Sequence, residues 1–126
     1  AVMTSLAAVN ELTSPGFYDH INAASNRLCD GLVRLFESAD IPAQVQGLGA
    51  RFGIFFGITD PVERFDDTLP RDQEMTARFI RACVDKGVYF HDYGSLVAGH
   101  HGVCSQHTLE DIDEALNRVE SALRVM

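Results

Sequence analysis

The chain has 126 residues, 46% of them hydrophobic, which is the size of one ordinary domain with enough apolar side chains for a core. Its formal net charge of −8 argues against nucleic-acid and membrane-surface partners, because an acidic surface repels phosphate backbones and anionic lipid headgroups. No run approaches the roughly 18 apolar residues of a membrane span, and we expect no signal peptide.

The first predicted element is a helix over residues 1–12. It has no capping residue before its apolar positions, so we interpret it as the end of a longer helix. Pro15 and Gly16 end it, since proline restricts its predecessor and glycine tolerates positive φ. A second helix is predicted over residues 17–39, because apolar residues recur there every three or four positions. These are Tyr18, Ile21, Leu28, Leu32, Leu35 and Phe36.

Two strands are predicted next, over residues 43–45 and 51–58, joined by a glycine-bearing turn at 46–49. The second is short, aromatic and bounded by turn residues, which is typical of a buried strand. Residues 60–69 combine proline with acidic side chains and are interpreted as an exposed loop.

The C-terminal half begins with a third predicted helix, over residues 72–85. Lys86 and Gly87 end it, a cation at the negative helix end followed by a glycine. We then expect a strand at 88–91, a loop from 92 to 101 and a short strand at 102–105.

The last helix begins after Thr108, which forms a capping box with Asp111. Its apolar residues step by three and four positions through residues 109–126. Paired strands between helices predict an α+β fold, a two-layer sandwich. Its sheet is expected to be mostly antiparallel, with three or four strands and with the helices packed on one face.

One segment concentrates polar side chains that can carry chemistry. A metal site is one interpretation, but the spacing matches no zinc motif. A nucleophilic pair of Cys104 with His107 or His101 is a second, although no oxyanion hole or orienting carboxylate is evident. We favour a third, a polar loop that faces a ligand or a neighbouring domain. The cluster consists of His91, Asp92, Tyr93, His100, His101, Cys104 and His107.

Two further features bear on function. The cysteines Cys29, Cys83 and Cys104 are widely spaced and form no CxxC pair, so we expect reduced thiols in a cytoplasmic protein. Arg51 opens an apolar strand, where it is either an edge residue with an exposed head or a carboxylate-binding group, for which its planar fork is suited.

Three stretches in order resemble the C-terminal small domain of class III pyridoxal-phosphate aminotransferases, near glutamate-1-semialdehyde aminomutase. The first is the helix break at 12–18, and the second is the strand at 49–56. The third joins residues 86–90 to the helix start at 107–113. The resemblance implies that residues 1–12 are the truncated inter-domain helix and that residues 13–126 are the small domain.

The resemblance also implies what is missing. In this family the upstream large domain holds the Schiff-base lysine, the acid partner of the pyridine nitrogen and the phosphate-binding residues. Lys86 is the only lysine and is expected to be solvated at a helix end, unlike a desolvated aldimine lysine. We therefore expect no catalytic, cofactor-binding or metal residues here, and pyridoxal phosphate only in a parent transaminase or aminomutase.

By the same resemblance the small domain contributes a wall of the substrate pocket and part of a homodimer. Its substrate-pocket candidates are Arg51, His91, Tyr93, His100 and His101. Many family members carry an arginine in the final strand, whereas residues 102–105 have none. This departure favours a semialdehyde or β-amino-acid-like substrate for the parent. The alternative is a free-standing binding module of the same fold.

Overall fold

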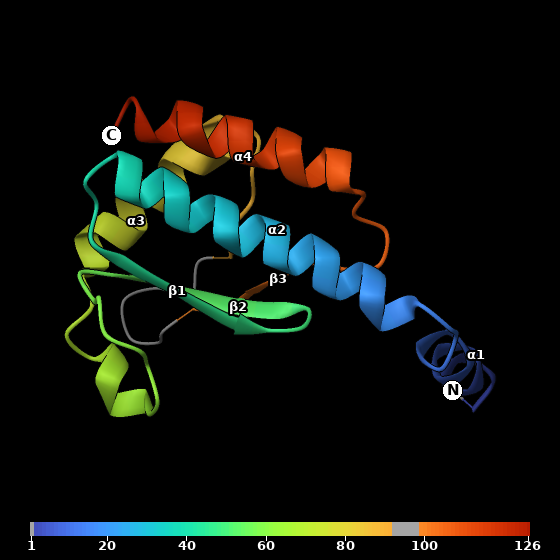
Figure 1. Cartoon of the computed structure of the whole chain (residues 1–126). Coiled ribbons are helices and arrows are strands. Elements are labelled where there is room, and N and C mark those ends of the chain that lie inside the picture. Colours follow the sequence, from blue (N-terminus) through green and yellow to red (C-terminus); the bar gives the residue numbers. More distant parts are fainter. Residues whose placement is uncertain (1, 92–98) are drawn as a thin grey trace.

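The structure is a computed structural model that describes residues 2–91 and 99–126 (Figure 1). These residues form four α-helices, one 3₁₀ helix and three strands. In chain order the elements are α1 (Val2–Leu12), α2 (Phe17–Ser38), β1 (Ala43–Leu48), β2 (Arg51–Phe56), η1 (Phe65–Thr68), α3 (Gln73–Asp85), β3 (His101–Gly102) and α4 (Leu109–Leu123).

The strands form an antiparallel sheet in the order β1-β2-β3. The β1–β2 hairpin pairs Ala43 with Phe56 and Leu48 with Arg51, so β1 continues through most of the predicted turn. Figure 1 shows α2, α3 and α4 on one side of this sheet. The predicted α+β fold with an antiparallel sheet and packed helices is confirmed.

The core lies between the sheet and these three helices. Alternation along β2 directs Phe52, Ile54 and Phe56 inward and leaves Arg51 exposed. The rings of Phe36 and Phe79 pack against Phe56 at centroid distances of 5.2 and 5.1 Å. Such aromatic contacts add to the stabilisation that comes from burying the rings.

The two longest helices, α2 and α4, approach each other closely at a glycine of α2. A Cβ on Gly31 of α2 would lie 2.4 Å from Leu116 Cδ1 of α4. A side chain at position 31 would therefore require the Leu116 side chain to move. The N-terminus of α4 has the predicted capping box: the hydroxyl of Thr108 accepts from the N–H of Asp111, whose carboxylate accepts from the N–H of Thr108.

Two predicted strands differ from the structure. Residues 88–91 form no strand, and the strand predicted at 102–105 is the two-residue β3 at His101–Gly102. The N–H of Val88 bonds instead to the carbonyl of Cys83, in the turn that closes α3. The side chains do alternate as predicted, with Phe90 buried and Tyr89 exposed.

The predicted loop 60–69 is also more ordered than expected. It contains η1, and it is attached to β1 through Gln46. The Gln46 amide donates to the carbonyl of Val62 at 2.7 Å and accepts from the N–H of Val62 at 3.0 Å. The Gln46 side chain therefore binds the 60–69 segment through both its amide N–H and its amide oxygen.

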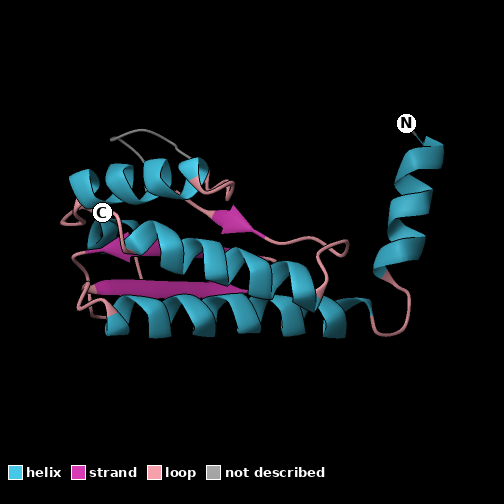
Figure 2. Cartoon of the chain, turned by 90° about the horizontal axis from the view of Figure 1, so that it is seen from above, coloured by secondary structure: helices cyan, strands magenta, loops and turns pink. Residues whose placement is uncertain are grey.

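Helix α1 stands apart from the other layers (Figure 2). None of its residues is buried, and Val2, Met3, Leu6, Val9 and Leu12 are all exposed. The break that follows α1 occurs where the sequence predicted it. No helix in the described part of the chain is both long enough and apolar enough to cross a bilayer.

Candidate functional site

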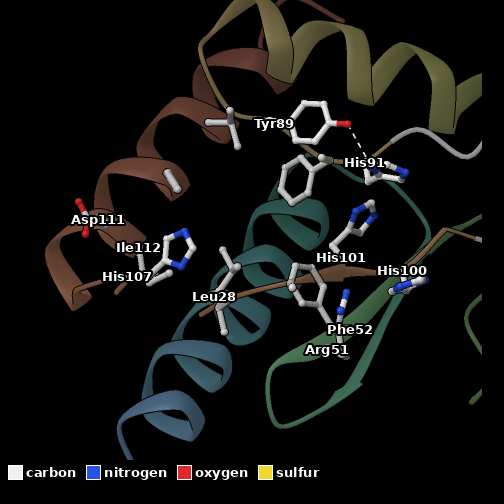
Figure 3. Close-up of a pocket in the computed structure, with 15 residues that line it drawn as sticks. Leu28, Arg51, Phe52, Tyr89, His91, His100, His101, His107, Asp111 and Ile112 are labelled. Atoms are coloured by element: carbon white, nitrogen blue, oxygen red, sulfur yellow. Dashed lines mark hydrogen bonds between the residues drawn. The ribbon is translucent and has the colours of Figure 1, made fainter. Parts of the chain in front are cut away.

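A pocket of about 290 Å³ lies between residues 88–91, the edge strand β3 and the start of α4 (Figure 3). Four of the five predicted substrate-pocket residues line it, namely Arg51, His91, His100 and His101. The fifth, Tyr93, lies outside the described residues. The structure thus brings together side chains from β2, from β3 and from the segments flanking residues 92–98.

Arg51 reaches the pocket across the backbone of β3. It pairs with Gly102, and a Cβ on Gly102 would lie 3.3 Å from Arg51 Cδ and 3.7 Å from its Nη1. The missing side chain at Gly102 therefore leaves the space in which the arginine lies. Within the described residues the Arg51 guanidinium has no hydrogen-bond or ion-pair partner. The described residues thus engage none of its five N–H donors.

His101 lies deeper and behaves as an apolar ring. It packs between Phe52 and Phe90, at centroid distances of 5.5 and 5.1 Å. Its Nδ1 is buried and has no hydrogen-bond partner among the described residues. Burial, and then the neighbouring charges of His100 and His91, lower the pKa of His101 to about 4. The ring is therefore neutral at pH 7.

His91 and His100 are exposed at the rim of the pocket. The His91 Nδ1 lies 3.0 Å from the Tyr89 hydroxyl, within hydrogen-bond distance, and the two rings meet edge to face. The His91 ring therefore lies beside the Tyr89 side chain (Figure 3). Two imidazoles thus lie at the rim together with the Arg51 guanidinium.

The other end of the pocket is formed by residues that sequence reasoning assigned elsewhere. Asp111 lines the pocket, but hydrogen bonds from Thr108 lower the pKa of its carboxyl and hold it in the helix cap. Leu28 of α2 and Ala115 of α4 provide apolar floor. The helical periodicity of residues 17–39 predicted a core position for Leu28, and the packing of α2 against α4 places it at a cavity.

Cys104 and His107, one of the alternative chemical pairs, are in contact. The Sγ of Cys104 lies 3.3 Å from His107 Nδ1, which also accepts the backbone N–H of Cys104 at 3.0 Å. A thiolate–imidazolium pair would need a proton on that Nδ1, where it would face the N–H donor. Because Nδ1 already faces a backbone N–H, the contact fits a Cys104 S–H that donates to the ring.

The other reactive groups lie away from the pocket. All three cysteines are free, and burial raises the pKa of Cys83 to about 12. Lys86 is exposed at the C-cap of α3 and does not line the pocket. Across residues 2–91 and 99–126, no three His, Cys, Asp or Glu side chains are grouped so that they could hold a metal ion.

No family model matches the sequence. Among solved structures, the chain is similar to a glutamate-1-semialdehyde-aminomutase from Pseudomonas aeruginosa PAO1, with a TM-score of 0.73 and 19% identity, over 90% of this chain and 24% of that one. It is also similar to an omega-transaminase from Sphaerobacter thermophilus, with a TM-score of 0.67 and 17% identity, over 88% and 24%.

A third similar structure is the PLP internal aldimine form of the Sphingopyxis sp. MTA144 FumI protein, with a TM-score of 0.69 and 20% identity. That match covers 89% of this chain and 23% of the FumI chain. The chain thus spans about a quarter of the length of each of these proteins. It has the fold of one part of these transaminase and aminomutase structures, as the resemblance in its sequence implied.

Proposed function

We propose that the chain is the C-terminal small domain of a class III pyridoxal-phosphate-dependent aminotransferase or aminomutase. One observation carries the proposal: about 90% of the chain has the fold of a quarter of a glutamate-1-semialdehyde-aminomutase. The ordered motifs at 12–18, 49–56 and 107–113 support the same assignment. The domain would form part of the parent enzyme's substrate pocket and of its dimer.

The described residues do not fit pyridoxal phosphate as a covalently held cofactor. The only lysine of the chain, Lys86, is exposed at the end of α3, and its carbonyl accepts from Arg118 Nη1 at 3.3 Å. A lysine that forms an imine needs a desolvated site that lowers its pKa. The parent's large domain would supply that lysine, so we expect no transamination by this chain alone.

The role of this domain would be to bind and orient the substrate. Arg51, His91 and His100 form a cationic and hydrogen-bonding rim, and the neutral His101 contributes an apolar surface behind it. Tyr93 stays a candidate from sequence alone. In the parent this rim would be one wall of the pocket, and the cofactor would face it from the large domain.

The partners we propose are the missing large domain and a second copy of the enzyme. Helix α1 supports this, because its apolar residues have no cover in the described structure. Monomeric proteins rarely leave contiguous apolar patches beyond a few hundred Å² open. The free cysteines fit the cytoplasmic location that we propose for the parent.

A free-standing binding module is the second candidate function. It is favoured by the completeness of the core, which buries Phe36, Phe56 and Phe79 almost fully without any partner. A chain with such a core can fold alone and present its pocket to a ligand. The free-standing module and the small domain of a larger enzyme have the same fold. They differ in whether a large domain precedes residue 1.

The upstream coding DNA decides between them. The first proposal expects an open reading frame that continues through Ala1 from a large domain with an internal-aldimine lysine. A start codon directly before the codon of Ala1, with no such domain encoded upstream, would instead support the free-standing module. A protein-level test adds pyridoxal phosphate to the purified chain and measures the visible absorbance. A stoichiometric aldimine band that borohydride fixes on Lys86 would contradict our assignment of the chemistry to the large domain.

A further inference from the structure

Strand β1 lies at the edge of the sheet and pairs with β2 on one side. The direction of its backbone groups follows from the bond that the Gly57 N–H donates to the Pro42 carbonyl at 2.8 Å, directly before the strand. Because bonding directions alternate along a strand, every second residue from Gln44 onward bonds to β2. The residues between them direct their N–H and C=O groups away from β2. These are Ala43, Val45 and Gly47.

The outer edge of β1 has no partner in the described part of the chain. No backbone or side-chain group of residues 2–91 and 99–126 bonds to the outward groups of Ala43, Val45 or Gly47. Proteins commonly block such an edge with charged side chains or proline, because it can add another strand. Strand β1 contains neither, and the uncharged run covers residues 41–50 of a chain with 10 Lys and Arg and 18 Asp and Glu. The edge is therefore open to a further strand.

The charge of the chain indicates which strand fits this edge. The formal net charge is −8, so two copies of the chain repel each other over most of their surfaces. Residues 41–50 let two copies meet without placing like charges opposite each other. A basic segment of another protein would find no carboxylate on β1 to pair with. The composition of the strand thus favours a second copy of β1.

Two copies of β1 match in one antiparallel register that is centred on Val45. Val45 then lies opposite the second copy's Val45, and Ala43 lies opposite the second copy's Gly47. Each outward N–H meets an outward C=O in this register. A slip by one residue would set outward groups against groups that already bond to β2. A slip by two would leave one outward residue of each strand without a partner in the other strand.

The packing of α2 against β1 favours the same register. Val33 of α2 and Ala43 line a groove of about 300 Å³ at the start of β1. The Ala43 side chain points to the helix-covered face of the sheet, because its ladder partner Phe56 is buried. The second copy's Gly47 would lie opposite Ala43, so the residue that enters beside α2 has no side chain. At the centre, the half-buried Val45 of each copy would cover that of the other.

We propose that the outer edge of β1 is a self-association site, at which a second copy adds its own β1 antiparallel across a two-fold axis. The two three-stranded sheets become one continuous sheet. This inference goes beyond the proposed function, since it uses neither the pocket nor a large domain. It is also separate from the apolar surface of α1, so a chain that uses both surfaces assembles beyond the dimer.

The test is residue-resolved amide exchange with water, measured by NMR on the full chain at two concentrations and one pH. The amides of Ala43, Val45 and Gly47 should exchange about threefold more slowly at about 2 mM than at about 0.1 mM, as mass action for a dimer requires. The amide of Gln44, which bonds to β2, is the internal reference and should be protected at both concentrations. Equal rates of the outward amides at both concentrations, whether fast or slow, would overturn the proposal. Burial of α1 by a second copy would leave this alternation along β1 unchanged.

One variant removes the central donor of the edge. Val45→Pro deletes an outward N–H, and an edge strand tolerates proline at such a position. It should abolish the concentration dependence at Ala43 and Gly47, while the Gln46 amide stays protected by its bond to β2. Concentration-dependent protection that persists in this variant would overturn the role of the edge.

A second variant keeps the backbone intact. Gln44→Glu places a carboxylate on β1 of both copies and should weaken the association about two- to fivefold. Its matched control is Gln73→Glu, which adds the same charge at the exposed start of α3 and should leave the association unchanged. Equal weakening by both variants would assign the effect to net charge and overturn the contact at β1.

The competing occupant is an extended segment of a different protein. A synthetic peptide of residues 41–50 supplies the strand alone, and its control is a peptide of the same composition in scrambled order. The 41–50 peptide should slow the exchange of the outward amides more than the scrambled peptide does. Equal slowing by both would overturn the assignment to a second copy. None of these outcomes bears on the domain assignment, which the upstream DNA decides, so the two proposals fail separately.

Discussion

Arg27 of α2 and Asp113 of α4 form a bidentate ion pair, with Nε–Oδ1 and Nη2–Oδ2 distances of 2.6 Å each. The hydrogen bond from Arg27 is the main reason why the pKa of the Asp113 carboxyl is lowered. The pair joins the two helices on the same side as the Gly31–Leu116 contact, and both of its side chains are about half exposed. Its contribution to stability is therefore expected to be small.

We predict that Arg27→Gln lowers the melting temperature slightly at low salt and by less at about 1 M NaCl, because salt screens an exposed pair. The contribution of Asp113 is present above the unfolded pKa of an aspartate and is lost as pH falls through its lower folded value. Thermal melts of Arg27→Gln, Asp113→Asn and the double variant measure the coupling. Additive effects in the double-mutant cycle would show that the pair contributes nothing.

The half-buried imidazole of His101 predicts that the protein loses stability in acid. Its folded pKa of about 4 lies below the ordinary value of 6.5, so folding favours the neutral ring. Its contribution is fully present above about pH 6.5 and is lost as pH falls toward 4, by up to about 3 kcal/mol. Urea unfolding from pH 7.5 down to pH 4 measures this loss.

His101→Phe should flatten that pH profile, since phenylalanine fits between Phe52 and Phe90 and does not titrate. It also removes a buried nitrogen that lacks a partner, so it should not lower the stability at pH 7. The matched control is His100→Gln, which changes an exposed histidine next to it and should keep most of the acid sensitivity. The same steep profile in His101→Phe would assign the effect to other groups.

The capping box of α4 predicts that removing the Thr108 hydroxyl measurably lowers the free energy of unfolding. Thr108→Ala removes the acceptor of the Asp111 N–H and should lower the free energy of unfolding by about 1 kcal/mol. Ser121→Ala is the control in the same helix, where the hydroxyl bonds only to the carbonyl of Asn117. Chemical denaturation should show Ser121→Ala near neutral. Equal losses in both variants would mean that the cap is not the cause.

Association is predicted from α1, as part of the proposed partners. Its exposed apolar residues include Val2, Leu6 and Val9, which are covered by nothing in the described structure. We expect the intact chain to form a dimer at about micromolar concentration by covering them with a second copy. Light scattering of residues 1–126 and of residues 13–126 compares the two. A monomer of the intact chain at high concentration would contradict the prediction.

The fold was largely predictable because its strongest signals are local. The Thr108–Asp111 cap and the apolar periodicity of α2 and α4 depend on residues a few positions apart, and both are found in the structure. The strand expected at 88–91 was wrong for a non-local reason. Alternation was present, but a strand also needs a partner, and among the described residues β3 pairs with β2 and not with this segment.

The sequence predicted which residues belong to the candidate site, but it did not predict how deeply each of them lies in the pocket. The unusual density of histidines and the placement of Arg51 marked four residues that the structure does bring to one pocket. The depth of His101 could not be anticipated, because it depends on the rings of Phe52 and Phe90 from two distant segments. Leu28 carried no signal at all beyond that of an ordinary core position.

The isolation of α1 has a consequence for hydrogen exchange. A helix of 11 residues with no buried side chain is shorter than the roughly 12–15 residues at which isolated helices become stable in water. In the monomer its amides should therefore exchange through local opening, at rates close to those of an unstructured peptide, while the amides of α2 exchange only when the core opens. Slow exchange of individual α1 amides would then show which residues another surface has covered. The exchange of the core amides would stay unchanged.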